Sequence, residues 1–149
     1  MGRLLFSRGN FQQAVVCFDR ANLLLLRDIS RCYHLRKQAR LLEAGSTQRK
    51  AAFLDAGNQF SQCGIVEHDQ SQGCYLRAGE CYVEAGKDME ASDAFYKAKE
   101  FTKGAQCARN AANFDRAVEI VRNHPVEESV ATKIISVCRV HFLREKAFK

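Results

Sequence analysis

Large and small apolar residues alternate along the chain at intervals of three and four positions. The alternation runs through residues 53–64 and 75–86, and it returns in residues 101–112 with alanine at three of its four positions. Such intervals place every member on one face of a helix. A large side chain beside a small one lets two helices approach closely. The spacing therefore predicts packed helices, and no segment alternates at period two for long enough to predict a strand.

A second helix is expected to follow three of these segments after a short turn. Gly9-Asn10 and Gly86-Lys87-Asp88 supply residues that favour turns, so the predicted unit is an antiparallel helix pair. Ser46 or Thr47 and Asn113 are candidate N-caps. The whole pattern predicts a helix remnant at 3–8, followed by about eight helices near 11–21, 27–44, 47–64, 70–85, 88–99, 101–111, 114–123 and 128–147.

The order of aromatic and small residues resembles the tetratricopeptide (TPR) repeat. Seven signature positions match between residues 75 and 98, namely Tyr75, Gly79, Tyr82, Gly86, Ala91, Phe95 and Ala98. The resemblance is irregular, because the small signature residues stand at 2, 57, 79 and 105 instead of recurring every 34 positions. Residues 65–72 are also too short for a partner helix. The resemblance implies an all-α, TPR-like α-solenoid of antiparallel helix pairs with irregular repeats.

Three longer stretches resemble a larger family. They read LFSRGNFQQAVVCFDRA, RDISRCYHLRKQAR and AGECYVEAGKDMEASDAFYKAKEFTKGAQCARNAANFDRAVEIV. They are similar to the helical region that trails the core of large, mainly fungal TPR and ankyrin repeat-containing proteins with a UvrD-like superfamily 1 helicase domain. The resemblance spans nearly the whole chain and implies a single TPR-like segment, 1–149, of a larger protein. Its parts would be a basic first part (1–45), a TPR-like core (46–126) and a C-terminal helix (127–149).

Both ends of the chain fit that expectation of a fragment. The sequence opens inside a repeat that lacks its first aromatic residue, and it closes in a helical run, 142–149, with no stop signal. At 149 residues the chain suits one domain. Its 46% apolar content is enough to form a core.

Composition favours an intracellular protein, cytoplasmic or nuclear. No apolar run approaches the roughly 18 residues of a membrane helix, so no membrane association is expected. The seven cysteines are an odd number, none forms CxxC, and each falls within an apolar helical pattern. We therefore expect buried thiols in a reducing compartment.

The net charge of +6 is unevenly distributed. The first fifty residues carry a net +7, the next fifty −5 and the remainder +4, which does not match a uniform nucleic-acid footprint. The strongest basic feature is a group of cations on the helix predicted at 27–44, namely Arg27, Arg31, Arg36, Lys37 and Arg40. Some of these cations are four residues apart on one helix face, where like charges repel each other. This predicted basic surface is either a plain solvated face or a contact for phosphate or an acidic partner.

The TPR resemblance also implies a peptide-binding groove lined by the first helix of each pair. The positions that correspond to groove-facing residues are Asn58, Ser61, Gln62, Glu80, Glu84, Gln106, Arg109 and Asn110. The Lys/Arg/Asn clamp with which some TPR modules hold a terminal carboxylate is not reproduced, since Glu80 and Glu84 stand where positive charge is expected. A basic peptide is therefore the favoured groove ligand, although plain solvent exposure is the simpler role for any one of these residues.

Catalytic and metal chemistry find little support in the sequence. The phosphate-binding motif GxxxxGK[ST] is absent, and no two of His68, Cys74 and Cys81 have the two-to-four-residue spacing of structural zinc ligands. Cys138 and His141 are three apart but lie among apolar residues, which favours ordinary packing. We expect no catalytic residue, metal or cofactor.

The sequence thus predicts a non-enzymatic module for protein–protein interaction or scaffolding. Its partner would be a protein, a peptide or another domain of a larger parent chain. The alternative is an accessory helical region of a UvrD-like, ATP-dependent helicase-type protein, in which the basic helix contacts nucleic acid.

Overall fold

The computed structural model describes residues 2–20, 23–65 and 70–147. Within these ranges every regular element is a helix, which confirms the all-α prediction. The helices are α1 (Gly2–Ser7), α2 (Phe11–Arg20), α3 (Leu24–Arg40), α4 (Thr47–Ile65), α5 (Ser71–Glu84), α6 (Asp88–Lys97), α7 (Phe101–Asn110), α8 (Phe114–Asn123) and α9 (Glu128–Ala147).

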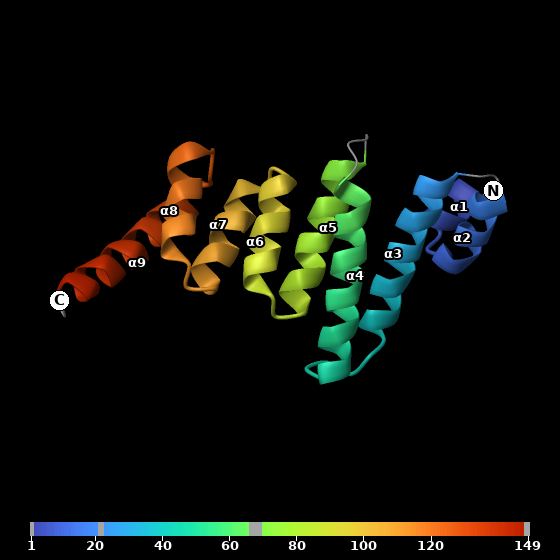
Figure 1. Ribbon diagram of the computed structural model, residues 1–149, viewed down its shortest axis with the longest axis horizontal. Coiled ribbons are helices and arrows are strands. Elements are labelled where there is room, and N and C mark those ends of the chain that lie inside the picture. The colour runs from blue at the N-terminus through green and yellow to red at the C-terminus, as the bar shows by residue number, and fades with distance from the viewer. Residues whose placement is uncertain (1, 21–22, 66–69, 148–149) are drawn as a thin grey trace.

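The helices stack in chain order into an elongated row with the two termini at opposite ends (Figure 1). Each helix packs against the next one along the chain, and α9 packs on both α7 and α8. This packing of adjacent helices is compatible with the solenoid that the TPR resemblance implies. Helix α4 packs directly between α3 and α5.

Helix α3 differs from its predicted bounds at both ends. It begins at Leu24, three residues before the predicted start, so the leucines before Arg27 are part of the helix. The Arg27 amide donates to the Leu23 carbonyl at 3.0 Å. It ends at Arg40, where the next amides bond to carbonyls three residues back. Gly45 therefore lies in the turn before α4, with φ +78°.

Glycines receive the aromatic rings of neighbouring helices, as the spacing predicts. A Cβ on Gly79 would lie 2.7 Å from the Phe95 ring of α6, and one on Gly64 would lie 2.8 Å from the Tyr75 ring of α5. A side chain at either glycine would force the neighbouring ring to shift. The alternation of aromatic and small residues thus sets the close approach of α4 to α5 and of α5 to α6.

Short turns join the paired helices. Gly9 and Gly86 adopt φ values of +80° and +75°, which confirms the predicted turns. The equivalent turn after α7 places Ala112 at φ +60°, a conformation that costs an L-residue about 1–2 kcal/mol. Two of the predicted N-caps form: the Arg49 amide donates to Ser46 Oγ at 3.1 Å, and the Arg116 amide donates to Asn113 Oδ1 at 3.3 Å.

Candidate functional site

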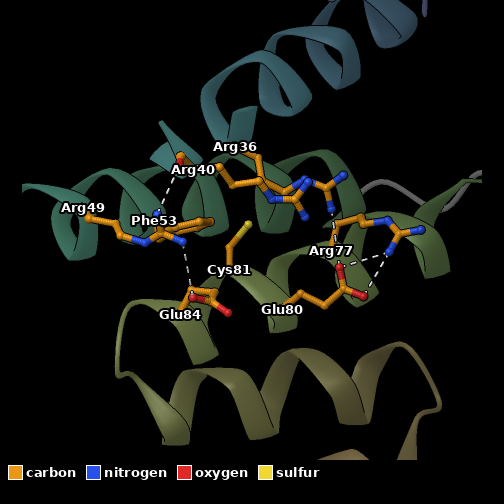
Figure 2. Close-up of a pocket in the computed structure, with 8 residues that line it drawn as sticks. All are labelled: Arg36, Arg40, Arg49, Phe53, Arg77, Glu80, Cys81 and Glu84. Carbon is orange, nitrogen blue, oxygen red and sulfur yellow. Dashed lines mark hydrogen bonds and ion pairs between the residues drawn. The ribbon is translucent and has the colours of Figure 1, made fainter. Parts of the chain in front are cut away.

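A pocket of about 460 Å³ opens where α3, α4 and α5 meet (Figure 2). We call it the arginine pocket, because four of the residues that line it are arginines. Its residues are Arg36 and Arg40 from α3, Arg49 and Phe53 from α4, and Arg77, Glu80, Cys81 and Glu84 from α5. Helices that are separated by up to 30 residues of sequence thus contribute to one cavity.

One end of the arginine pocket is a guanidinium–carboxylate cluster centred on Glu80. Arg77 Nη1 donates to both carboxylate oxygens at 2.9 and 3.0 Å, and Arg36 Nη1 donates to Oε2 at 3.4 Å. Figure 2 shows both guanidinium groups directed toward this carboxylate. The Glu80 side chain is still 36% exposed, so its carboxylate remains accessible from the pocket.

The two arginines of this cluster are held by Tyr33. The Arg36 guanidinium lies over the tyrosine ring at 4.8 Å, and Arg77 Nε donates to its hydroxyl at 3.3 Å. Burial lowers the pKa of the Arg36 guanidinium, which is only 14% exposed, and the nearby charge of Arg40 acts in the same direction. The hydrogen bond to Tyr33 raises the pKa of Arg77, and the bonds to Glu80 add to that shift. Both groups stay charged and are fixed in place.

The other end of the arginine pocket is organised by Arg49. Its Nη1 donates to the Arg40 and Leu42 carbonyls at 3.1 Å each, which satisfies acceptors at the C-terminal end of α3. Its Nη2 lies 3.9 Å from Glu84, and its guanidinium covers the Phe53 ring at 5.0 Å. Arg49 therefore joins all three helices while its charge is only loosely balanced by Glu84.

The arginine pocket carries an excess of positive charge. Four guanidinium groups face two carboxylates, Glu80 and Glu84. Among the residues that the structure describes, the exposed side chain of Arg40 forms no ion pair. The cavity is thus suited to an anionic group rather than to a cationic one.

The predicted basic surface is divided by the fold. Arg27 pairs with Asp19 at 2.9 Å and with Asp28 at 3.1 Å, and Lys37 Nζ donates to the Gly9 carbonyl at 3.1 Å. Arg31 is exposed, whereas Arg36 turns inward to the arginine pocket and Arg40 stands at its wall. The five cations therefore do not form one continuous face.

The predicted groove residues are divided as well. Glu80 and Glu84 belong to the arginine pocket, but their partners are arginines of this chain. Asn58 and Ser61 bond to the Tyr82 hydroxyl, which donates to Asn58 Oδ1 at 2.7 Å and lies 3.2 Å from Ser61 Oγ. The remaining predicted members lie elsewhere: Gln62 is exposed on α4, Gln106 and Arg109 are half-buried on α7, and Asn110 is exposed there.

Sequence reasoning missed four residues of the arginine pocket: Arg49, Phe53, Arg77 and Cys81. The i,i+3 spacing of Arg77 and Glu80 was a visible signal for their ion pair. The others carry no local signal, because they meet only through the stacking of α3, α4 and α5.

Cysteine and histidine residues show structural roles. Cys138 is buried and its Sγ donates to the Phe114 carbonyl at 3.8 Å, while the His141 ring lies against the Phe114 ring at 4.4 Å. Burial raises the pKa of Cys81 to about 12, so this thiol is neutral at physiological pH. Across the described ranges no three His, Cys, Asp or Glu residues are placed to hold a metal ion, and His68 lies outside those ranges.

In comparisons with known proteins, no family model, no curated protein and no solved structure matches this chain. Of the helices in the described part of the chain, none has both the length and the apolar character needed to cross a membrane.

Proposed function

We propose that the chain is a TPR-like protein-interaction or scaffolding module with no catalytic activity of its own, and that the arginine pocket is part of its partner-binding surface. The observation that carries this proposal is the pocket itself. It is open to solvent, is assembled from three successive helices, and is lined by arginines that intramolecular contacts already hold in place. Side chains fixed before binding lose little conformational entropy when a partner docks.

The stacked architecture supports the same role. Helix pairs that contact only their neighbours leave long faces open, and such faces are the usual binding surfaces of repeat proteins. All seven cysteines are free thiols in the structure, and five of them are buried, in keeping with the reducing intracellular setting that we infer. The partner is then a protein or peptide, or another domain of a larger parent chain.

The second candidate is an accessory helical region of a UvrD-like helicase-type protein. The exposure of Arg31, Lys37 and Arg40 on α3 favours a phosphate contact. The ion pairs of Arg27 and Arg36 count against it, because they neutralise two of the five cations on this helix. We therefore place nucleic-acid binding second.

A selection from a random peptide library on the purified full chain tests the first proposal. We expect one or more peptide families to be enriched, and we expect an enriched peptide to bind in solution by fluorescence anisotropy. Steep salt-dependent binding of a single-stranded oligonucleotide, with no enriched peptide, would favour the second candidate instead.

A further inference from the structure

The carboxylate of Glu80 shows what the arginine pocket can bind. Two arginines from different helices converge on it, and one of them contacts both oxygens at about the same distance, 2.9 and 3.0 Å. A single nitrogen, Arg77 Nη1, makes both contacts, so the second terminal nitrogen of this guanidinium is not used by Glu80. Charge-assisted contacts of this kind are those by which arginine binds a carboxylate. The pocket therefore already contains one occupied carboxylate position.

Glu80 stays partly open to solvent in this cluster. Its side chain and that of Arg77 are each 36% exposed, and an ion pair at that exposure contributes little to folding. A carboxylate from outside can therefore reach Arg77 from the pocket and compete with Glu80 for it. The exposed guanidinium of Arg40 offers a further contact at the same wall.

Aromatic surfaces in the arginine pocket are covered, which disfavours nucleic acid as the ligand. The Phe53 ring is 2% exposed and lies under Arg49, and the Tyr33 ring lies under Arg36. Single-stranded nucleic acid is bound largely through open aromatic faces on which bases stack.

We propose that the arginine pocket binds the side-chain carboxylates of an acidic segment in a partner protein, with Glu80 as an internal competitor that the ligand displaces. This inference rests on the proposed interaction function and names the chemistry of its partner. It replaces the basic peptide expected from the sequence, since the two glutamates there are neutralised by arginines of this chain. Recognition uses side-chain carboxylates, so the acidic segment does not have to end its chain.

The probe is a fluorescein-labelled peptide of six glutamates flanked by glycines, with an amidated C-terminus, and the same peptide with glutamines is its control. Binding is measured by fluorescence anisotropy on the full chain. We expect the glutamate peptide to bind and the glutamine peptide to bind at least tenfold more weakly, because each lost charge-assisted contact is worth about tenfold in affinity.

Variants on α3 and α5 locate the site. Arg40→Ala removes a pocket cation and should weaken binding about tenfold, whereas Arg31→Ala removes another exposed cation of the same helix, outside the pocket, and should leave binding unchanged. Glu80→Gln removes the internal competitor and should tighten binding severalfold. Circular dichroism confirms that each variant is folded, and Glu80→Gln carries the test alone if Arg40→Ala is not.

Several outcomes would overturn this inference. Equal losses in Arg31→Ala and Arg40→Ala would indicate a diffuse charge effect, and weaker binding by Glu80→Gln would mean that Glu80 is not a competitor. Tighter binding of a single-stranded oligonucleotide that Arg40→Ala abolishes would assign the pocket to phosphate. Library peptides that lack acidic residues and bind independently of Arg40 would overturn this inference but leave the interaction module intact, whereas the absence of any peptide binding would overturn both.

Discussion

The contact between Gly79 and Phe95 gives a direct test of how the repeat spacing builds the fold. An alanine at position 79 would place its methyl group 2.7 Å from two carbons of the Phe95 ring and 2.9 Å from a third. Ordinary contact begins at 3.4 Å, so the ring must retreat by about 0.7 Å. It is 3% exposed, and the three-residue turn between α5 and α6 limits any separation of the two helices.

The expected cost of Gly79→Ala is the difference of two effects. Forcing a methyl group into a closed core costs about 1–3 kcal/mol, while alanine is favoured over glycine in a helix by about 1 kcal/mol. Gly73 supplies the matched control, because it lies in the same helix and a Cβ there would meet no atom within 4 Å. Gly73→Ala should therefore be stabilised by part of the helix propensity of alanine, without the cost of a clash.

Urea denaturation followed by circular dichroism measures both variants. We expect Gly79→Ala to lose up to about 2 kcal/mol of unfolding free energy and Gly73→Ala to gain up to about 1 kcal/mol, a separation of about 1–3 kcal/mol that reflects the clash. Equal stabilities for the two variants would refute the conclusion that small residues in the repeat are required by close helix packing.

Three further predictions test local features of the structure. Ala112→Gly should raise the unfolding free energy by about 0.5–1 kcal/mol, because glycine removes the strain at φ +60°, whereas Ala111→Gly, at φ −81°, should lower it; thermal denaturation of both variants decides this. Ser92→Ala should cost about 0.5–1.5 kcal/mol in urea denaturation, because the buried hydroxyl donates to the Gly104 carbonyl of α7 at 2.8 Å and the substitution removes that hydrogen bond between neighbouring helices. Burial raises the pKa of Cys107 to about 11 from the 9.0 of an unperturbed thiol, so the unfolded chain loses this proton first and stability should fall as the pH rises from about 9 to 11; Cys107→Ala should make that slope less steep, while the buried Cys74 and Cys81 thiols keep part of it.

The helices could be predicted from sequence because each depends on short-range spacing. Gly79 and Tyr82 lie in α5 at intervals that fix one helical face, and the structure places both in the buried interface. The bounds of α3 could not be read in the same way. The local pattern of Leu23–Leu26 fits either a linker or the start of a helix. Which of the two forms depends on how α3 packs against the neighbouring helices.

The arginine pocket depends on long-range contacts that spacing does not encode. Arg36 and Glu80 are 44 residues apart and belong to helices on either side of α4. Their meeting requires the angle at which α3 crosses α4, which the side chains of the whole interface determine. The sequence identified both residues as candidates but assigned them to separate surfaces, because it could not show that one neutralises the other.

Assembly of the arginine pocket from three helices links binding to stability. The pocket exists only while α3, α4 and α5 remain stacked, so a ligand that binds there stabilises the stacked state by mass action. At 100 times its dissociation constant, the glutamate peptide should stabilise that state by about 2.7 kcal/mol and slow local amide exchange by about a hundredfold. Helices of a repeat array contact only their neighbours, so the added protection should be greatest in α3 and α5 and smallest in α8, which lies farther along the row (Figure 1). Hydrogen exchange read by mass spectrometry measures each helix separately. Protection that appeared in α8 but not in α3 would place the peptide outside the arginine pocket, even if its affinity were as high as expected.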